Sequence, residues 1–317
     1  MKELHAYRKK PRILVVTPEC AALSVSMGRT CAHPFSSGGG TGEAMAVIVS
    51  RLYEESVDVH LAFPDYCAVL RRRIDPEFIQ GCDSSRIEIS QRLHRAQDRI
   101  FYHAEGVCSI DPDENKKRAI AFQREVIHEF LPRVRPDLVH CVGAMTGLIP
   151  AVARSLGIAS IFTLDGIETA PCTLAEMENR GIDPGNFWQK LYYAGYPGTY
   201  EQCRNDNPVD LMTSGVFCAS WVHAFSSSLL GAILDDNGSS AGSALQEQLA
   251  DKIRNRRVAA IPPPSGPSLS EPDGTSPARR FTPFFNMVRL YEAALGRFLF
   301  PEHQPSLAEP VKMMQSA

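Results

Sequence analysis

Arg12-Ile-Leu-Val-Val-Thr-Pro18, followed by Ser36-Ser-Gly-Gly-Gly-Thr-Gly-Glu43, is the stretch that decides the fold of this chain. An apolar β-branched run, a glycine cluster and then apolar residues at helical spacing (44–52) predict a strand, a loop and a helix, the opening of a Rossmann-like domain. Glycines let a ligand approach bare backbone, and the N–H groups at a helix start suit a phosphate. The spacing matches neither the dinucleotide fingerprint nor a Walker motif, so a ligand-binding loop and a plain flexible loop both stay open.

Composition narrows the class of protein. The chain has 317 residues, 44% of them hydrophobic and 22% charged, with a net charge of −3. A balanced charge argues against a nucleic-acid partner, and no apolar run approaches the ~20 residues that would span a membrane. The charged start lacks the apolar region of a signal peptide, and nine cysteines without a C-x-x-C pair predict reduced thiols. We therefore expect a soluble, cytoplasmic protein without a metal site or cofactor.

The repeated order of strand, loop and helix continues along the chain. Residues 57–63 alternate and predict a second strand, and residues 115–134 carry an apolar stripe typical of a helix. A strand at 137–141, a helix at 148–156 and a strand at 160–164 follow. These units predict a parallel, doubly wound α/β sheet whose ligands bind at the carboxyl ends of the strands.

Three later segments are less regular. Residues 87–89 and 99–102 are interpreted as short strands of an edge hairpin. An aromatic cluster between residues 187 and 200 could stack on sugar rings, although packing in the core is the commoner role of such clusters. Its members are Phe187, Trp188, Tyr192, Tyr193, Tyr196 and Tyr200.

The domain boundaries follow from composition. Residues 11–261 contain all the predicted strands. Residues 262–283 are rich in proline and serine and are interpreted as a linker. An apolar helical pattern at 284–300 predicts an isolated helix, and residues 301–317 are predicted to be a disordered tail.

Several motifs together resemble a known family. They are Ile13-Leu-Val-Val-Thr-Pro-Glu-Cys20, Gly39-Gly-Thr-Gly-Glu43, Phe63-Pro-Asp-Tyr66, and Asp137-Leu-Val-His-Cys141 with Thr146-Gly-Leu-Ile-Pro150. In this order they resemble the amino-terminal domain of bacterial glycogen and starch synthases. The resemblance implies a retaining glycosyltransferase that moves glucose from ADP-glucose to an α-1,4-glucan. It implies a GT-B architecture, in which two Rossmann-like domains face each other and the second supplies most donor contacts.

The departures from the family pattern concern polar residues. The family's glycine loop usually reads Lys-x-Gly-Gly-Leu-Gly-Asp, and Ser37 stands at the position of its phosphate-binding lysine. Met145 stands where an active-site histidine is usual, and Asp165 replaces a second histidine. Serine cannot supply the positive charge of the lysine, and the thioether of methionine neither donates a hydrogen bond nor carries a charge. We therefore expect this domain to be weak or inactive alone. We also expect that it lacks the donor domain.

The resemblance also implies site residues. Asp165 and Thr146 are the candidates for catalysis, and Glu19 and Tyr66 are the candidates for glucan binding. The expected partners are α-glucan, ADP-glucose and a separate chain that carries the donor domain. A non-catalytic module that binds glucan or a protein is the alternative, and a decayed gene product without a ligand also stays open. The nucleotide-sugar site is expected at Ser37, Gly38, Gly39, Gly40, Gly42 and Glu43.

Overall fold

A seven-stranded sheet is the centre of the structure. The computed structural model describes residues 10–19, 40–66, 91–102, 111–167, 171–235, 242–264 and 277–299. All neighbouring strands of the sheet run parallel, in the order β3-β2-β1-β4-β5-β8-β9. The predicted Rossmann-like, doubly wound α/β fold is therefore confirmed. The strands are β1 (Arg12–Val16), β2 (Asp58–Pro64), β3 (Leu93–Ala96), β4 (Leu138–Val142), β5 (Ala159–Leu164), β8 (Trp221–Ala224) and β9 (Val258–Ala260).

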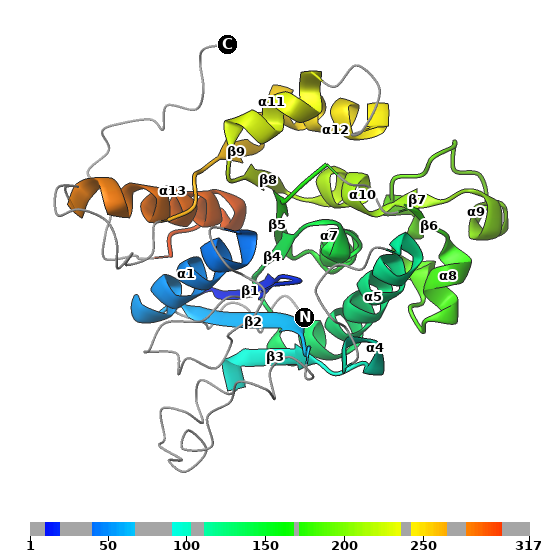
Figure 1. Cartoon of the computed structure of the whole chain (residues 1–317), viewed down its shortest axis with the longest axis horizontal. Helices are drawn as coiled ribbons and strands as arrows, with labels where there is room; N and C mark the ends of the chain where they lie inside the picture. The colour runs from blue at the N-terminus through cyan, green and yellow to red at the C-terminus, as the bar shows by residue number, and fades with distance from the viewer. Residues whose placement is uncertain are drawn as a thin grey trace.

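Helices cover both faces of this sheet (Figure 1). On one face, Ile13 of β1 belongs to the same buried cluster as Ile48 of α1 and Tyr291 of α13. On the other face, Leu14 shares a cluster with Phe122 of α5. Because neighbouring residues of a strand point to opposite faces, a continuous apolar run such as β1 is what a sheet covered on both sides requires. The longer helices are α1 (Thr41–Glu54), α5 (Pro112–Glu125), α7 (Ile149–Leu156), α10 (Leu211–Cys218), α11 (Ser227–Asp235), α12 (Gly242–Arg254) and α13 (Pro277–Leu295).

Shorter elements fill the connections. No helix of the described residues is long and apolar enough to cross a membrane. A two-stranded antiparallel ribbon, β6 with β7, lies in the insertion between β5 and α10. The short elements are α4 (Arg99–Tyr102), η4 (Val126–Phe130), α6 (Leu131–Val134), η5 (Ala144–Thr146), β6 (Pro171–Cys172), α8 (Leu174–Asn179), η6 (Pro184–Asn186), η7 (Trp188–Lys190), α9 (Tyr200–Asp206) and β7 (Val209–Asp210).

The predicted edge hairpin is wrong at residues 99–102. They form the helical turn α4, because Asp98 caps its start. The side chain of Asp98 accepts a hydrogen bond from the backbone N–H of Ile100, and its carbonyl accepts one from the backbone N–H of Phe101. An aspartate that caps the first N–H groups favours a helix over a strand. The strand at this edge is β3, which pairs parallel with β2. Residues 87–89 lie outside the described residues.

The carboxyl-terminal helix is not isolated, so that prediction is wrong. α13 begins at Pro277, inside the predicted linker, and its side chains Phe284, Met287 and Val288 are buried against the sheet. The apolar spacing does indicate a helix, but this helix packs against a face of the sheet. Residues 265–276 and the predicted tail 301–317 lie outside the described residues.

A buried chain of hydrogen bonds joins α13 to three strands. His223 Nε2 lies 3.2 Å from the carbonyl oxygen of Ile261, which can only accept, so Nε2 carries the proton. Burial lowers the pKa of His223 to about 4 and that of His140 well below its usual value, so both rings are neutral near pH 7. The Thr163 hydroxyl therefore donates to His223 Nδ1 (2.8 Å) and accepts from His140 Nε2 (2.6 Å). Tyr291 donates to His140 Nδ1 (2.7 Å), which completes the chain.

Candidate functional site

The strand order indicates where a ligand would lie. β1 is followed outward by β2 and β3 on one side, whereas β4 and β5 continue on the other side. In open parallel sheets, ligands bind at the carboxyl ends of the strands, where the order reverses. That place is the edge formed by the residues after β1, β2, β4 and β5, which we call the carboxyl edge.

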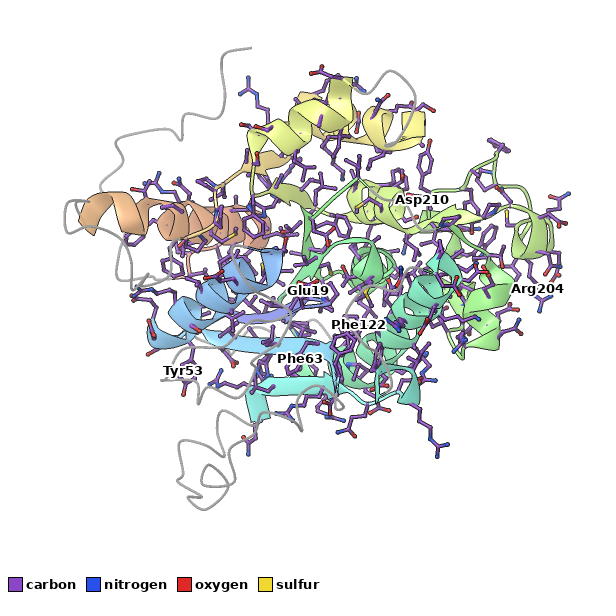
Figure 2. All side chains as sticks on the ribbon, viewed as in Figure 1. Glu19, Tyr53, Phe63, Phe122, Arg204 and Asp210 are labelled. Carbon is purple, nitrogen blue, oxygen red and sulfur yellow. The ribbon has the colours of Figure 1, made fainter. Side chains whose placement is uncertain are left out.

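Glu19 lies at the carboxyl edge just after β1 (Figure 2). The Thr17 hydroxyl donates to the backbone carbonyl of Glu19 (2.7 Å) and accepts from the backbone N–H of Glu19 (3.3 Å). These two bonds fix the backbone turn after β1. Burial raises the pKa of the half-buried carboxyl above its usual 4.5. No hydrogen bond or ion pair reaches this carboxylate from another described residue.

The first turn of α1 packs against Glu19. A Cβ atom on Gly42 would lie 3.1 Å from Cβ of Glu19 and 3.4 Å from its Oε2. Gly40, the N-cap of α1, has an ordinary extended backbone and open space around its Cα, so only Gly42 is required by its surroundings. Glu43 is exposed in the first helical turn. Ser37, Gly38 and Gly39 lie outside the described residues.

Two residues follow β2 at the same edge. Tyr66 is only 3% exposed and packs edge-on against Phe101, at a centroid distance of 5.8 Å, so its ring is part of the core. Asp65 is 5% exposed, and its Oδ1 is buried without a hydrogen bond to any described residue. Asp65 is not among the site residues that the sequence predicts. Its burial could not be seen in the sequence, because an aspartate after a proline is common in exposed turns.

The residues after β4 and β5 form the other half of the edge. Gly143 has a φ of 69°, a left-handed value that favours glycine, and a Cβ there would meet the Asp165 carboxylate at 2.1 Å. Asp165 is exposed and rests against this bare backbone. Thr146 is fully buried, and its hydroxyl lies 3.0 Å from the carbonyl oxygens of both Val142 and Gly143, to which it donates. This hydroxyl is engaged in the fold, whereas the Asp165 carboxylate lies at the surface of the edge.

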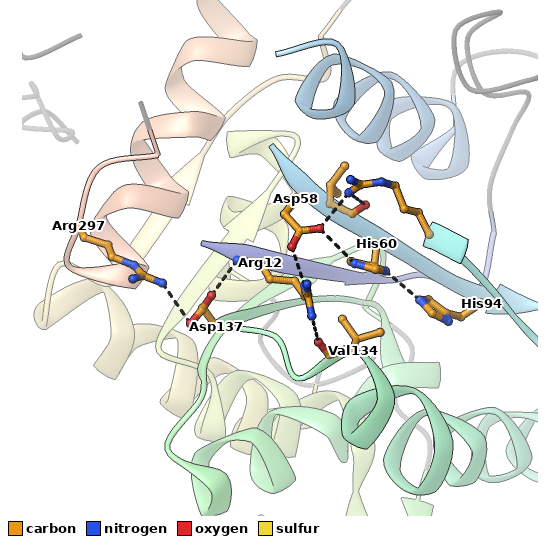
Figure 3. Close-up of polar contacts among 9 residues, drawn as sticks. Arg12, Asp58, His60, His94, Val134, Asp137 and Arg297 are labelled. Atoms are coloured by element: carbon orange, nitrogen blue, oxygen red, sulfur yellow. Dashed lines mark hydrogen bonds and ion pairs between the residues drawn. The ribbon is translucent and has the colours of Figure 1, made fainter. Parts of the chain in front are cut away.

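A second polar cluster occupies the opposite end of the sheet (Figure 3). Asp58, the first residue of β2, accepts from Arg12 Nε (2.6 Å) and Arg92 (2.9 Å) and lies 3.3 Å from His60 Nε2. Burial raises the pKa of Asp58, but the bonds from His60 and Arg12 outweigh this and hold it well below its usual value. His60 in turn contacts His94 at 3.1 Å. These groups pair with one another toward the amino ends of the strands, so we assign them a structural role.

The described residues contain no group of three or more His, Cys, Asp or Glu side chains that could hold a metal ion. Glu19 and Asp65 follow neighbouring parallel strands, whose register pairs Val16 with Ala62. The two carboxylates consequently belong to one end of the sheet.

Comparisons with known proteins identify the family to which this chain belongs. The family model described as the starch synthase catalytic domain matches residues 12–250, about three quarters of the chain. A glycogen synthase from Desulfitobacterium hafniense is 24% identical over 168 residues, which cover 46% of this chain and 36% of that protein. A glycogen synthase from Clostridium perfringens is 26% identical over 138 residues, covering 39% and 28%. The aligned part of this chain thus spans about a third of the relatives it matches.

A solved structure supports the fold. The catalytic domain of starch synthase IV from Arabidopsis thaliana, bound to ADP and acarbose, superimposes with a TM-score of 0.54 at 14% identity. The match covers 87% of this chain and 57% of that one. The parallel sheet, the motif order and the extent of the family match agree. This chain belongs to the family of starch synthase catalytic domains.

Proposed function

We propose that this domain binds an α-1,4-glucan at the carboxyl edge, with Glu19 accepting hydrogen bonds from sugar hydroxyls. The observation that carries the proposal is the half-buried Glu19 carboxylate, which has no polar partner among the described residues. A buried acceptor without a partner is unfavourable, so a ligand that donates hydrogen bonds to it gains affinity. Sugar hydroxyls are such donors, and the family's curated relatives are named glycogen synthases.

The roles proposed for the other candidates differ. Tyr66 lies in the core, so we propose that it supports the edge by packing rather than by stacking on sugar. Asp165 remains a candidate for contact with ligand because its carboxylate is exposed at the edge, whereas the engaged hydroxyl of Thr146 favours a structural role. Binding of ADP-glucose by residues 37–43 remains a prediction from the resemblance.

We further propose that this domain does not elongate glucan by itself. The matched positions for a phosphate-binding lysine and an active-site histidine hold Ser37 and Met145, and Met145 is half-buried against the core. Transfer of glucose needs groups that stabilise the developing charges and the leaving diphosphate. These substitutions equally favour the alternative, a non-catalytic module that binds glucan or a protein partner.

Co-sedimentation with glycogen tests the binding proposal. The wild-type chain should sediment with glycogen, and Glu19→Gln should weaken this binding about threefold to tenfold, because a charged acceptor forms stronger hydrogen bonds than an amide oxygen. Glu55→Gln, at the exposed carboxyl end of α1, is the matched control and should bind like wild type. Equal binding by wild type and Glu19→Gln would remove Glu19 from the site, and no sedimentation of the wild type would overturn the proposal.

A further inference from the structure

A second concave surface surrounds the loop that precedes α9. It is a cavity of about 640 Å³, within the size range of small-ligand pockets. Figure 1 shows α9 at the margin of the molecule, with α5 and α8 between it and α1. The residues that line the cavity are Ala194, Gly195, Tyr196, Gly198, Gln202, Cys203, Asp206, Asn207 and Pro208.

The backbone around this cavity is held in place. The Asn207 side chain clamps the loop, because its Oδ1 accepts from Gly195 N (2.8 Å) and its Nδ2 donates to Gly195 O (3.1 Å). The backbone N–H of Ala194 donates to the carbonyl of Pro208 (2.9 Å), which closes the base of the loop. A ligand would therefore meet a preformed surface and would not have to order it.

The far side of the loop is fixed by a capping box. Thr199 and Gln202 exchange side-chain and backbone hydrogen bonds at the start of α9. A Cβ on Gly198 would lie 2.1 Å from Oε1 of Gln202, so this position needs glycine if the cap is to form. The wall beside Tyr196 consequently stays bare backbone that a ligand can approach.

The chemistry of the lining selects the ligand. Tyr196 is 95% exposed, so its ring is free to stack on another flat apolar surface. Asp206 contributes an exposed carboxylate, and the lining contains no Lys, Arg or His. An aromatic face beside hydrogen-bond acceptors suits the apolar face and the hydroxyls of a pyranose, whereas a carboxylate without a cation repels a nucleotide diphosphate.

We propose that this cavity, which we call the Tyr196 pocket, is a second binding site for an α-1,4-glucan, separate from the carboxyl edge. The choice of glucan rests on the proposed function. The Tyr196 ring stacks on one sugar residue, and Asp206 accepts hydrogen bonds from its hydroxyls. Two separated sites on one branched polymer raise the effective concentration of glucan at the edge.

The test is a titration of the ¹⁵N-labelled chain with maltoheptaose, followed by amide NMR. Signals of Gly195, Gly198 and the Asn207 side chain should shift on binding. Tyr196→Ala should weaken that binding about threefold to tenfold, the size expected for loss of one stacking contact. Tyr196→Phe should keep it, and Phe285→Ala, at a 56% exposed position on α13, is the control for an exposed aromatic.

The two proposals fail in different ways. If signals around Glu19 shift while those of the pocket do not, or if Tyr196→Ala binds at the pocket as well as wild type, the second site is overturned and the proposed function stands. If the pocket responds in wild type and in Glu19→Gln alike, the second site is supported independently of the edge. If maltoheptaose shifts no signal, both proposals fall.

Discussion

The interior of the sheet and its carboxyl edge use polar side chains in opposite ways. Inside, Tyr291, His140, Thr163 and His223 form a directed chain in which each ring nitrogen and each hydroxyl has a partner. At the edge, the Glu19 carboxylate and Oδ1 of Asp65 lack hydrogen bonds from described residues. Satisfied buried groups stabilise the fold, whereas unsatisfied ones reduce stability unless a ligand completes them. The buried hydrogen-bond chain thus stabilises the fold, and we propose that the carboxyl edge binds the ligand.

The largest effect is expected from removing α13. A chain that ends after Pro264 should not fold, because the buried side chains of α13, including Phe284, Met287 and Tyr291, each stabilise the fold by about 1.5–3 kcal/mol and a domain has only ~5–15 kcal/mol in total. Thermal unfolding followed by circular dichroism measures this.

A pair of substitutions controls for the truncation. Met287→Asp places a charge at a 1% exposed position and should unfold the chain as the truncation does, whereas Phe285→Asp, at a 56% exposed position on the same helix, should leave the melting temperature nearly unchanged. A cooperative melt of the truncated chain at the wild-type temperature would show that α13 is dispensable and would restore residues 11–261 as the folding unit.

Removing the central group of the buried hydrogen-bond chain should cause the next largest loss of stability. Thr163→Val keeps the shape but leaves Nε2 of His140 and Nδ1 of His223 without partners, so the free energy of unfolding should fall by about 2–6 kcal/mol. Tyr291→Phe removes only the last bond of the chain and should cost about half as much. Urea denaturation measures both variants, and equal stability of Thr163→Val and wild type would contradict the directed chain.

The two regions should also respond to pH with opposite signs. Burial lowers the pKa values of His140 and His223 in the folded state. Below pH 6.5, the ordinary pKa of histidine, the unfolded chain therefore binds protons that the folded chain does not bind. The stability contributed by these neutral histidines is present above pH 6.5. It should fall by about 1.4 kcal/mol per pH unit and histidine as the pH drops toward 4.

The raised pKa of Glu19 acts the other way. The folded chain binds the proton of this carboxyl more readily than the unfolded chain, so acidification between its folded pKa and 4.5 favours folding while it removes the charged acceptor. Glycogen binding should therefore weaken at a higher pH than an ordinary carboxylate would dictate. Binding and urea stability measured from pH 7 to 4.5 check both signs, and a stability that is flat over this range would contradict the interior assignment.

The smallest change in stability, with a large change in binding, is expected at α1. Gly42→Ala adds a Cβ that crowds Glu19 at 3.1 Å, so the carboxylate must move and glycogen binding should fall several-fold. Better helix propensity offsets the crowding, so stability should change by less than about 1 kcal/mol. Gly40→Ala, where a Cβ meets nothing within 4 Å, is the matched control. Equal loss of binding in both variants would indicate that helix geometry, rather than the position of Glu19, controls the edge.

The sequence was sufficient for most of the sheet. β1, β4 and β5 are apolar runs of strand length between helices, and such patterns depend mainly on local sequence. Both ring nitrogens of His140 have hydrogen-bond partners, so this buried histidine of β4 is part of the core. The position of α13 could not be predicted, because contacts across 151 residues leave no local signal.

The candidate site was predicted only in part. Motif order pointed to Glu19 and to the residues after β4 and β5, but the sequence does not report burial. Tyr66 therefore appeared to be a contact for glucan although it is in the core, and Asp65 was overlooked although its Oδ1 is buried at the edge. Whether a polar side chain finds a partner is decided by neighbouring strands, which periodicity cannot reveal.

The most direct test of the proposed function is transfer of radiolabelled glucose from ADP-glucose to glycogen by the purified chain, with glycogen co-sedimentation measured on the same sample. We expect the chain to sediment with glycogen and to transfer no label above a heat-treated control, because Ser37 cannot supply the positive charge of the family's lysine and Met145 cannot supply the hydrogen bonds of its histidine. Label transferred to glycogen by the unmodified chain would contradict the proposal that this domain does not elongate glucan by itself.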